Sequence, residues 1–366
     1  MSAQPRYSDQ EYAAPPGDRV IRGRLPFYTP AELAATTSAE PEWIIEGYIG
    51  LEIVTELDGK VKRSGKTTLA LDAIAAILDG RPWLGQPTTF TKVIYLTEQQ
   101  RGPFLAALTR AGLQDRGDEL LVLFRHDFAA LKWADVVAEV AATAKASGAR
   151  LVVVDTISKL AGIRDENNTA DWSTALDPLT HAAHDGLAFL LCRHSRKGDA
   201  EIGESGRGSS AASGDVDIIL DLRRPTGNQP ATRRVIETMG RYSEHTPEKV
   251  IIDLTAEGYI LLGDDEAVSL ADAERIVSAL LGGDFGQKEN WTLDELIDES
   301  ENLPGGPLHR STCQRVLRHM RDRREVVEFV DDGGKPRRGH PWRYALRESV
   351  SAQSLRLYGQ KGIGAE

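Results

Sequence analysis

The segment from Gly59 to Thr68 holds the residues whose types and spacing are best suited to chemistry. It reads Gly-Lys-Val-Lys-Arg-Ser-Gly-Lys-Thr-Thr and precedes an apolar, helix-like run. A loop of this kind binds phosphate, because its backbone N–H groups and the positive end of the helix face the anion. Lys66 would reach the β- and γ-phosphates, and Thr67 would ligate Mg²⁺. The residues predicted to line this phosphate site are Gly59, Ser64, Gly65, Lys66, Thr67 and Thr68.

The first glycine of this loop departs from the usual spacing, Gly-x-x-x-x-Gly-Lys-[Ser/Thr]. That spacing would place a glycine at position 60, where the chain has Lys60, and Gly59 lies one residue earlier. Two arrangements are open: the loop carries one extra residue, or its first corner is built without glycine. A Gly-Lys-Thr triplet also occurs in ordinary basic turns, so the prediction needs partners elsewhere in the chain.

Three such partners follow apolar, strand-like runs: Glu98, Asp155 and His194. The carboxyl ends of parallel strands meet at one edge of a sheet, and ligands bind at that edge. Asp155 would hold Mg²⁺ through water, and Glu98 would orient or deprotonate a water molecule for hydrolysis. His194 would sense the γ-phosphate through a hydrogen bond. Together with Lys66, these residues predict a catalytic nucleotide site.

Basic residues follow the last of these strands. Arg196, Lys197 and Arg207 lie in or next to a Gly- and Ser-rich stretch and are candidates for contacts with phosphate groups of DNA or of a neighbour's nucleotide. Arg223 and Arg224 end a later strand-like run and are candidate arginine fingers that reach into an adjacent subunit. The sequence does not choose between Arg207 and these two, and an ordinary flexible loop is the plainer alternative for the Gly/Ser-rich stretch.

The elements that position these residues alternate between strand-like and helix-like runs from residue 41 to residue 262. Continuous apolar strands that alternate with helices predict an α/β fold, with a mostly parallel central sheet covered on both faces. The runs after residue 216 predict an antiparallel extension of this sheet.

This order of motifs resembles the RecA-like P-loop ATPases of the RepA/DnaB helicase group, and is closest to the stand-alone RepA-like ATPases of bacteria, plasmids and phages. Further similarity lies in Trp43–Gly47, Gly80–Gly85 and Asp165–Asn168. The resemblance implies a RecA-like fold and a hexameric ring or related homo-oligomer. It also implies Mg²⁺ and ATP between subunits and single-stranded DNA in a central channel. It assigns Lys66, Thr67, Glu98, Asp155 and His194 to the roles given above.

The carboxy-terminal part of the chain has a different charge and pattern. From Gly305 onward there are 13 Lys and Arg residues against 7 Asp and Glu, although the whole chain carries a net charge of −11. Three helix-like runs precede two strand-like runs around a basic segment, residues 331–340, which is the order of a winged helix. We therefore expect a small winged-helix α+β domain that binds DNA, duplex DNA included, or, alternatively, protein.

The run 310–323 has the pattern of a recognition helix. Apolar residues fall on one face at helical spacing and basic residues fall on others. The candidate DNA contacts are Arg315 and Arg318 on this helix, with Arg337 and Arg338 at the tip of the hairpin.

The expected organisation is a disordered or extended segment (1–40), an ATPase domain (41–262), a linker (263–270), a winged-helix-like domain (271–347) and a tail (348–366). Two cysteines at no metal-ligand spacing favour a reducing compartment. No signal-peptide pattern and no long apolar run is present, so we expect a soluble cytoplasmic protein without a membrane partner.

The function predicted from these features is an ATP-hydrolysing motor that acts on DNA in replication or recombination. A nucleotide-gated DNA-binding regulator or loader, without helicase activity, is the second reading. A small-molecule kinase is a third. The presence of Glu98, His194 and the carboxy-terminal domain argues against it.

Overall fold

The computed structural model describes residues 27–60, 64–166, 168–194, 216–225, 229–282, 290–301, 303, 306–330 and 341–349. Five predicted site residues lie outside these ranges: Arg196, Lys197, Arg207, Arg337 and Arg338. The chain divides into two units, Met1–Pro41 and Glu42–Glu366, which we describe separately.

The first unit contains the helix α1 (Pro30–Thr36), inside the segment expected to be disordered or extended. Its start is encoded locally. The Thr29 hydroxyl accepts a hydrogen bond from the Glu32 N–H, the Glu32 carboxylate accepts one from the Thr29 N–H, and proline occupies the first turn. None of its residues is buried, so local capping rather than packing specifies this helix.

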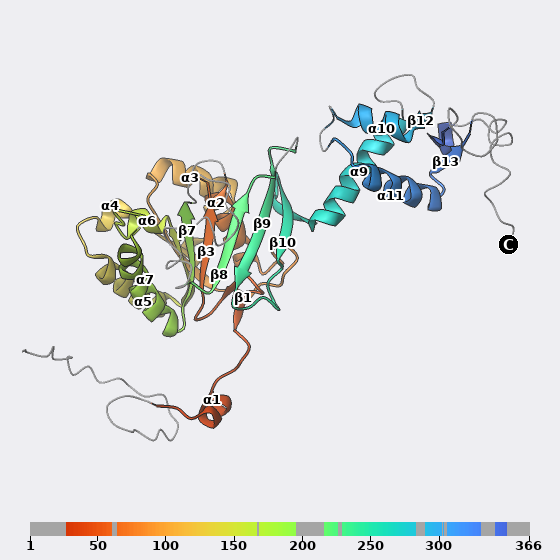
Figure 1. Cartoon of the computed structure of the whole chain (residues 1–366). Coiled ribbons are helices and arrows are strands. Elements are labelled where there is room, and N and C mark those ends of the chain that lie inside the picture. The colour runs from red at the N-terminus through yellow and green to blue at the C-terminus, as the bar shows by residue number, and fades with distance from the viewer. Residues whose placement is uncertain are drawn as a thin grey trace, which may run out of the picture. The chain divides into compact units, whose positions relative to one another are not determined.

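The second unit is built on a mostly parallel sheet, as the sequence predicts (Figure 1). Among the described residues it has nine strands in the order β11-β10-β9-β8-β3-β7-β6-β4-β5. Neighbours from β8 to β5 are parallel, and those from β11 to β8 are antiparallel. The strands are β3 (Val54–Gly59), β4 (Lys92–Thr97), β5 (Leu120–Phe124), β6 (Ala149–Asp155), β7 (Ala188–His194), β8 (Ile218–Arg223), β9 (Arg233–Gly240), β10 (Lys249–Thr255) and β11 (Gly258–Gly263). A two-stranded sheet of β1 (Trp43–Ile45) and β2 (Ile49–Gly50) precedes them.

Helices cover both faces of the main sheet. One apolar core joins α2 and α3 to side chains such as Leu57 and Val153, and a second joins α5 and α7 to Val54 and Val154. Alternate residues of each strand enter opposite cores because strand side chains alternate between faces. The helices are α2 (Lys66–Asp79), α3 (Arg101–Arg110), α4 (Arg125–Phe128), α5 (Trp133–Ser147), α6 (Ile157–Leu160) and α7 (Thr169–His184), with the 3-10 turn η1 (Gly117–Glu119).

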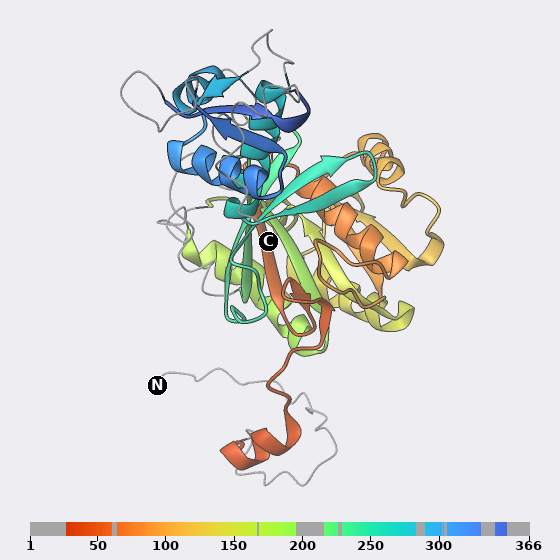
Figure 2. The ribbon, with the colours of Figure 1, turned by 90° about the vertical axis from the view of Figure 1, so that its right-hand side faces the viewer.

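The antiparallel extension β9–β11 also contacts α2, the helix that follows the predicted phosphate-binding loop. Figure 2 shows the β10–β11 hairpin beside α2. Tyr259 of β11 donates its backbone N–H to the Asp72 carboxylate on α2, and the Trp83 indole donates to the same carboxylate at 2.9 Å. The predicted extension therefore does more than lengthen the sheet, because it fixes α2 from the side.

The carboxy-terminal elements follow the predicted order of three helices and a hairpin. They are α9 (Asp265–Leu281), β12 (Trp291–Thr292), α10 (Leu293–Ser300), α11 (Arg310–Asp322), β13 (Val326–Phe329), β14 (Arg343–Leu346) and the 3-10 turn η2 (Arg347–Ser349). The three strands form an antiparallel sheet in the order β12-β14-β13. The sequence predicts β13 and β14 but not β12. Thr292 caps α10, because its hydroxyl accepts a hydrogen bond from the Glu295 N–H.

The predicted linker 263–270 is wrong at the level of secondary structure. Helix α9 begins at Asp265, because the Asp264 carboxylate caps it by accepting the Ala267 N–H at 2.7 Å. The acidic run that suggested an exposed linker is therefore a cap and a first helical turn. Val268 packs against Val235 and Ile251 of the sheet extension, so this turn has a fixed partner.

Within the described ranges, no helix is long and apolar enough to cross a membrane.

Candidate functional site

Gly59 forms the corner of the loop. A Cβ placed on Gly59 would lie 2.8 Å from Ser64 Oγ and 3.0 Å from the backbone oxygen of Leu222, so only glycine fits. The Ser64 hydroxyl in turn donates to the Lys60 carbonyl at 2.9 Å. Position 59 thus does what the first glycine of such a loop does. This favours the first of the two arrangements, a loop with one extra residue.

Lys66 is enclosed by this loop at the start of α2 and is only 5 % exposed. Its Nζ donates to the Gly59 carbonyl and lies 3.1 Å from His194 Nδ1 and 3.4 Å from Ser64 Oγ. Burial lowers the pKa of Lys66, and burial together with the Lys66 charge lowers the pKa of His194. A neutral imidazole can accept from the ammonium, so Lys66 and His194 form one hydrogen-bonded unit, although 128 positions separate them.

The predicted metal residues meet at the carboxyl edge of the sheet. The Thr67 hydroxyl donates to Asp155 Oδ2 at 2.7 Å, and Asp155 is 4 % exposed. Two further side chains complete this group. The buried Tyr95 hydroxyl donates to the same carboxylate oxygen at 2.8 Å, and Gln99 Nε2 lies 3.2 Å from the Thr67 hydroxyl. A threonine hydroxyl and a carboxylate side by side are hard oxygen ligands that suit Mg²⁺.

Sequence reasoning did not assign Tyr95, and it gave Gln99 little weight. A signal for Tyr95 exists: it lies two residues before Thr97, the register partner of Asp155, and so on the same face of the adjacent strand. This signal identifies Tyr95 only when the order of the strands in the sheet is known, and the sequence does not give that order directly.

Glu98 lies next to this group. Its backbone N–H donates to the Asp155 carbonyl at 3.0 Å, and its carboxylate accepts from the Thr156 hydroxyl at 3.1 Å. Burial raises the pKa of the half-buried Glu98, which makes it a stronger base once deprotonated. The site therefore holds a cation, a pair of oxygen ligands and a candidate base at one sheet edge.

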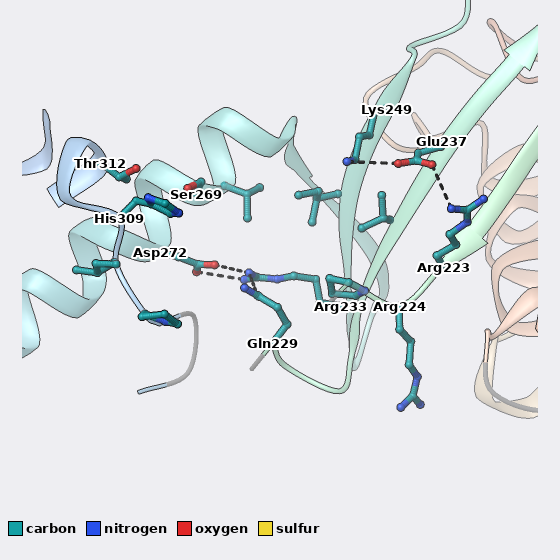
Figure 3. Close-up of a pocket in the computed structure, with 16 residues that line it drawn as sticks. Arg223, Arg224, Gln229, Arg233, Glu237, Lys249, Ser269, Asp272, His309 and Thr312 are labelled. Carbon is teal, nitrogen blue, oxygen red and sulfur yellow. Dashed lines mark hydrogen bonds and ion pairs between the residues drawn. The ribbon is translucent and has the colours of Figure 1, made fainter. Parts of the chain in front are cut away.

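The two candidate arginine fingers in the described range line a cavity of about 410 Å³ beside the sheet extension. Arg223 pairs with Asp221 and lies 3.8 Å from Glu237, which also pairs with Lys249. In Figure 3, Arg224 extends away from these pairs. The fold thus places Arg223 among carboxylates of its own chain.

The predicted recognition helix α11 has its apolar face buried, with Val316, Leu317 and Met320 in the carboxy-terminal core. Its basic face is different from the expected one, because several arginines pair with acids. Arg315 pairs with Glu266 of α9, whereas Arg318 is exposed. The other pairs join Arg310 to Asp294, Arg321 to Glu328 and Arg323 to Glu274. These pairs reduce the positive charge that the helix offers to a polyanion.

Comparison with known families agrees with the geometry of the loop. Residues 22–200 match the family model described as an AAA domain. This part of the chain is therefore similar to that family. A solved structure of a KaiC-like protein from the hyperthermophilic archaeon Pyrococcus horikoshii OT3 is similar at 15% identity and a TM-score of 0.43, with 60% of this chain and 93% of that chain covered. None of the curated proteins matches the chain.

Proposed function

We propose that the second unit holds a P-loop NTPase domain that binds ATP with Mg²⁺ and hydrolyses it, and that hydrolysis drives an action on DNA. The observation that carries the proposal is the meeting of Lys66, the Thr67–Asp155 pair and Glu98 at one sheet edge. These are the parts that phosphoryl transfer to water requires: positive charge for the phosphates, oxygen ligands for the metal ion and a group that directs the water.

The chemical roles follow from the contacts. Thr67 and Asp155 would hold Mg²⁺, which neutralises phosphate charge when bound. Lys66 donates to phosphate oxygens in place of the Gly59 carbonyl and His194. Glu98, held by Thr156, takes a proton from the attacking water. His194 loses its Lys66 contact when Lys66 turns to phosphate, and so reports the nucleotide state to the segment that follows it.

DNA as the partner is supported by the resemblance to RepA-like ATPases and by the basic residues after His194. We extend the proposal to a homo-oligomer, hexameric by that resemblance, in which an arginine of one subunit completes the site of the next. Arg223 and Arg224, at the end of β8, are the candidates for this role within the described range.

The test is ATP turnover with and without single-stranded DNA, together with strand displacement on a forked duplex. The proposal expects turnover that single-stranded DNA stimulates several-fold and displacement that requires ATP. Lys66→Ala is the control, because it removes the phosphate-binding cation. Phosphate released without a phosphorylated acceptor separates an ATPase from a small-molecule kinase. Turnover that neither kind of DNA changes would contradict a DNA-directed activity.

A nucleotide-gated regulator is the second candidate, and one observation favours it. Helix α9 is a single helix that contributes Val268 to the sheet extension and Ile276 to the carboxy-terminal core. A change at the nucleotide site therefore has a continuous path to the winged-helix-like part. Nucleotide-dependent binding of duplex DNA, with no strand displacement, would select this candidate over the motor.

A further inference from the structure

Arg234 of β9 contacts the nucleotide loop directly. Its Nε donates to the Ser64 carbonyl at 2.7 Å, and its Nη1 donates to the carbonyls of Ala231 at 2.7 Å and Arg233 at 2.6 Å. The residue is 7 % exposed. Ser64 immediately precedes the Gly-Lys-Thr triplet, so this arginine touches the part of the loop nearest to Lys66.

Arg234 is a buried cation whose hydrogen-bond partners are backbone carbonyls. Within the described ranges it makes no ion pair with a carboxylate. Its neighbour in the strand, Arg233, is equally buried but pairs with Asp272 of α9 (Figure 3). Burial disfavours the Arg234 charge and lowers the pKa of this residue although the Asp253 carboxylate acts in the opposite direction, so an anion that arrives beside it is favoured. The anion that a P-loop receives is the phosphate chain of a nucleotide.

A second side chain from the same extension reaches the next loop residue. The Tyr259 hydroxyl lies 2.9 Å from the position that a Cβ would take on Gly65, where φ is +94°. Tyr259 is itself fixed by its backbone N–H, which donates to Asp72 of α2. Two consecutive residues at the end of the loop thus contact β9 and β11.

We propose that Arg234 is a positioning residue of the nucleotide site, which holds the end of the lengthened loop at Ser64 and adds a buried positive charge that the nucleotide phosphates neutralise. A loop with one extra residue has more conformations to lose when it closes on phosphate. A guanidinium that ties the Ser64 carbonyl to β9 restricts these conformations before the nucleotide arrives. The inference rests on the proposed function, since it concerns the same site.

The experiment measures binding of a fluorescent ATP analogue with Mg²⁺ to the full chain, and thermal unfolding with and without Mg-ATP. Arg234→Gln removes the positive charge and the forked N–H donors of the guanidinium. Arg234→Lys keeps the charge but not the fork. Arg233→Gln is the matched control, because Arg233 is the adjacent buried arginine but faces Asp272 instead of the loop. We expect Arg234→Gln to raise the Kd about 10-fold or more, which corresponds to about 1.4 kcal/mol, with Arg234→Lys in between.

Stability gives an independent readout. Arg234→Gln removes a costly buried charge but also removes donors from backbone carbonyls, so its nucleotide-free Tm should stay close to that of wild type, whereas the rise in Tm that Mg-ATP causes should be smaller. Arg233→Gln should do the reverse, with a lower nucleotide-free Tm and a Kd within about twofold of wild type, because it removes the buried partner of Asp272 and leaves it only the more exposed Arg275 at 3.8 Å. This opposite pattern distinguishes positioning from a purely structural role.

Two results would overturn the inference: an Arg234→Gln variant that binds nucleotide as tightly as wild type, or one that matches Arg233→Gln in both Tm and Kd. Wild-type protein that binds no Mg-ATP would instead overturn the proposed function, and this inference with it. The two failures are therefore separable.

Discussion

Glu98 and Asp155 are neighbouring carboxylates whose surroundings suit them to different chemical roles. Asp155 accepts hydrogen bonds from the Thr67 and Tyr95 hydroxyls, which fix its carboxylate beside Thr67, where we propose that Mg²⁺ binds. Glu98 has one hydroxyl partner, Thr156, and burial raises its pKa. A carboxylate with few partners and a raised pKa is suited to accept a proton, and one among fixed hydroxyls is suited to ligate.

Glu98→Gln should therefore lower ATP turnover by about 10²–10⁴-fold, the range for loss of a general base, with little change in nucleotide affinity. Wild-type turnover should also fall as the pH decreases through the raised pKa of Glu98, above its ordinary value of 4.5, because the protonated carboxyl cannot accept a proton. Steady-state rates over pH 4.5–8 measure both effects. Glu139→Gln on the exposed face of α5 is the control. A Glu98→Gln variant with normal turnover would refute the assignment.

The protonation of another buried carboxylate, Glu56, should affect the stability of the fold. It accepts two hydrogen bonds from Arg193, at 3.2 and 3.3 Å, and the Arg193 guanidinium lies 4.4 Å from the centre of the Trp172 ring. Burial raises the pKa of Glu56 to about 7, against the lowering effect of Arg193. This pair supports the strand end that carries His194.

Because its folded pKa exceeds its unfolded value of 4.5, Glu56 contributes stability below pH 4.5 that is lost as the pH rises through about 7. Between pH 5 and pH 8, wild type should lose roughly 1–3 kcal/mol more unfolding free energy than Glu56→Gln, since one pKa unit is about 1.4 kcal/mol. Urea unfolding at both pH values measures this difference. Equal losses in the two proteins would show that Glu56 does not titrate in this window.

At the scale of elements, the turn between β3 and α2 depends on Gly59. Gly59→Ala places a Cβ 2.8 Å from Ser64 Oγ and 3.0 Å from the Leu222 carbonyl, and the carbonyl cannot move without shifting β8. We expect a cost of about 1–3 kcal/mol in unfolding free energy and a loss of nucleotide binding of at least tenfold.

The control for this loop substitution is Gly102→Ala in α3, where an added Cβ meets nothing within 4 Å. Alanine at this helical position should stabilise the protein slightly, by up to about 1 kcal/mol, without changing nucleotide affinity. Titration with labelled nucleotide and thermal unfolding compare the two variants. Nucleotide binding by Gly59→Ala that equals wild type would mean that the corner tolerates a side chain.

Elements whose signal is local were predictable from the sequence. Continuous apolar runs marked the strands of the sheet, and their last residues marked Glu98, Asp155 and His194, because a strand end in a parallel sheet is also the ligand edge. Contacts made across the fold were not predictable in this way. Arg234 reaches Ser64 from 170 positions away, and nothing in the local sequence around Arg234 indicates that partner.

Errors of element boundary have a similar origin. The acidic run before α9 has the composition of an exposed linker, and its role as a cap depends on the packing of Val268 against the sheet extension. On α11 the helical period correctly placed the apolar face, but the pairing of Arg315 with Glu266 comes from a different helix. Single-segment patterns give a side chain's face, and only the assembled fold gives its partner.

At the scale of the second unit, α9 is the element that two cores share. Val268 lies in the cluster with Val235 and Ile251, and Ile276 lies in the carboxy-terminal core. The Arg233–Asp272 pair joins the same helix to β9, the strand that also carries Arg234. A rigid helix that is held at both ends should make the two cores unfold together.

Ala271→Pro tests this connection. Ala271 is exposed, lies between the two halves of α9 and contributes to neither core, so proline there breaks the helix without removing a core side chain. The expected cost is about 3 kcal/mol, and it should fall on the carboxy-terminal part. Calorimetry should show one transition in wild type and a separate, lower transition in the variant. Ala271→Ser keeps the helix and is the control.

The same variant decides whether the connection carries function. Nucleotide affinity and basal ATP turnover should stay within about twofold of wild type, because Lys66, Glu98 and Asp155 belong to the unaffected sheet edge. Any effect of duplex DNA on turnover should disappear if it passes from the carboxy-terminal part through α9 to β9. Retention of that effect in Ala271→Pro would place the route for DNA elsewhere, in the basic residues that follow His194, and would favour the motor over the nucleotide-gated regulator.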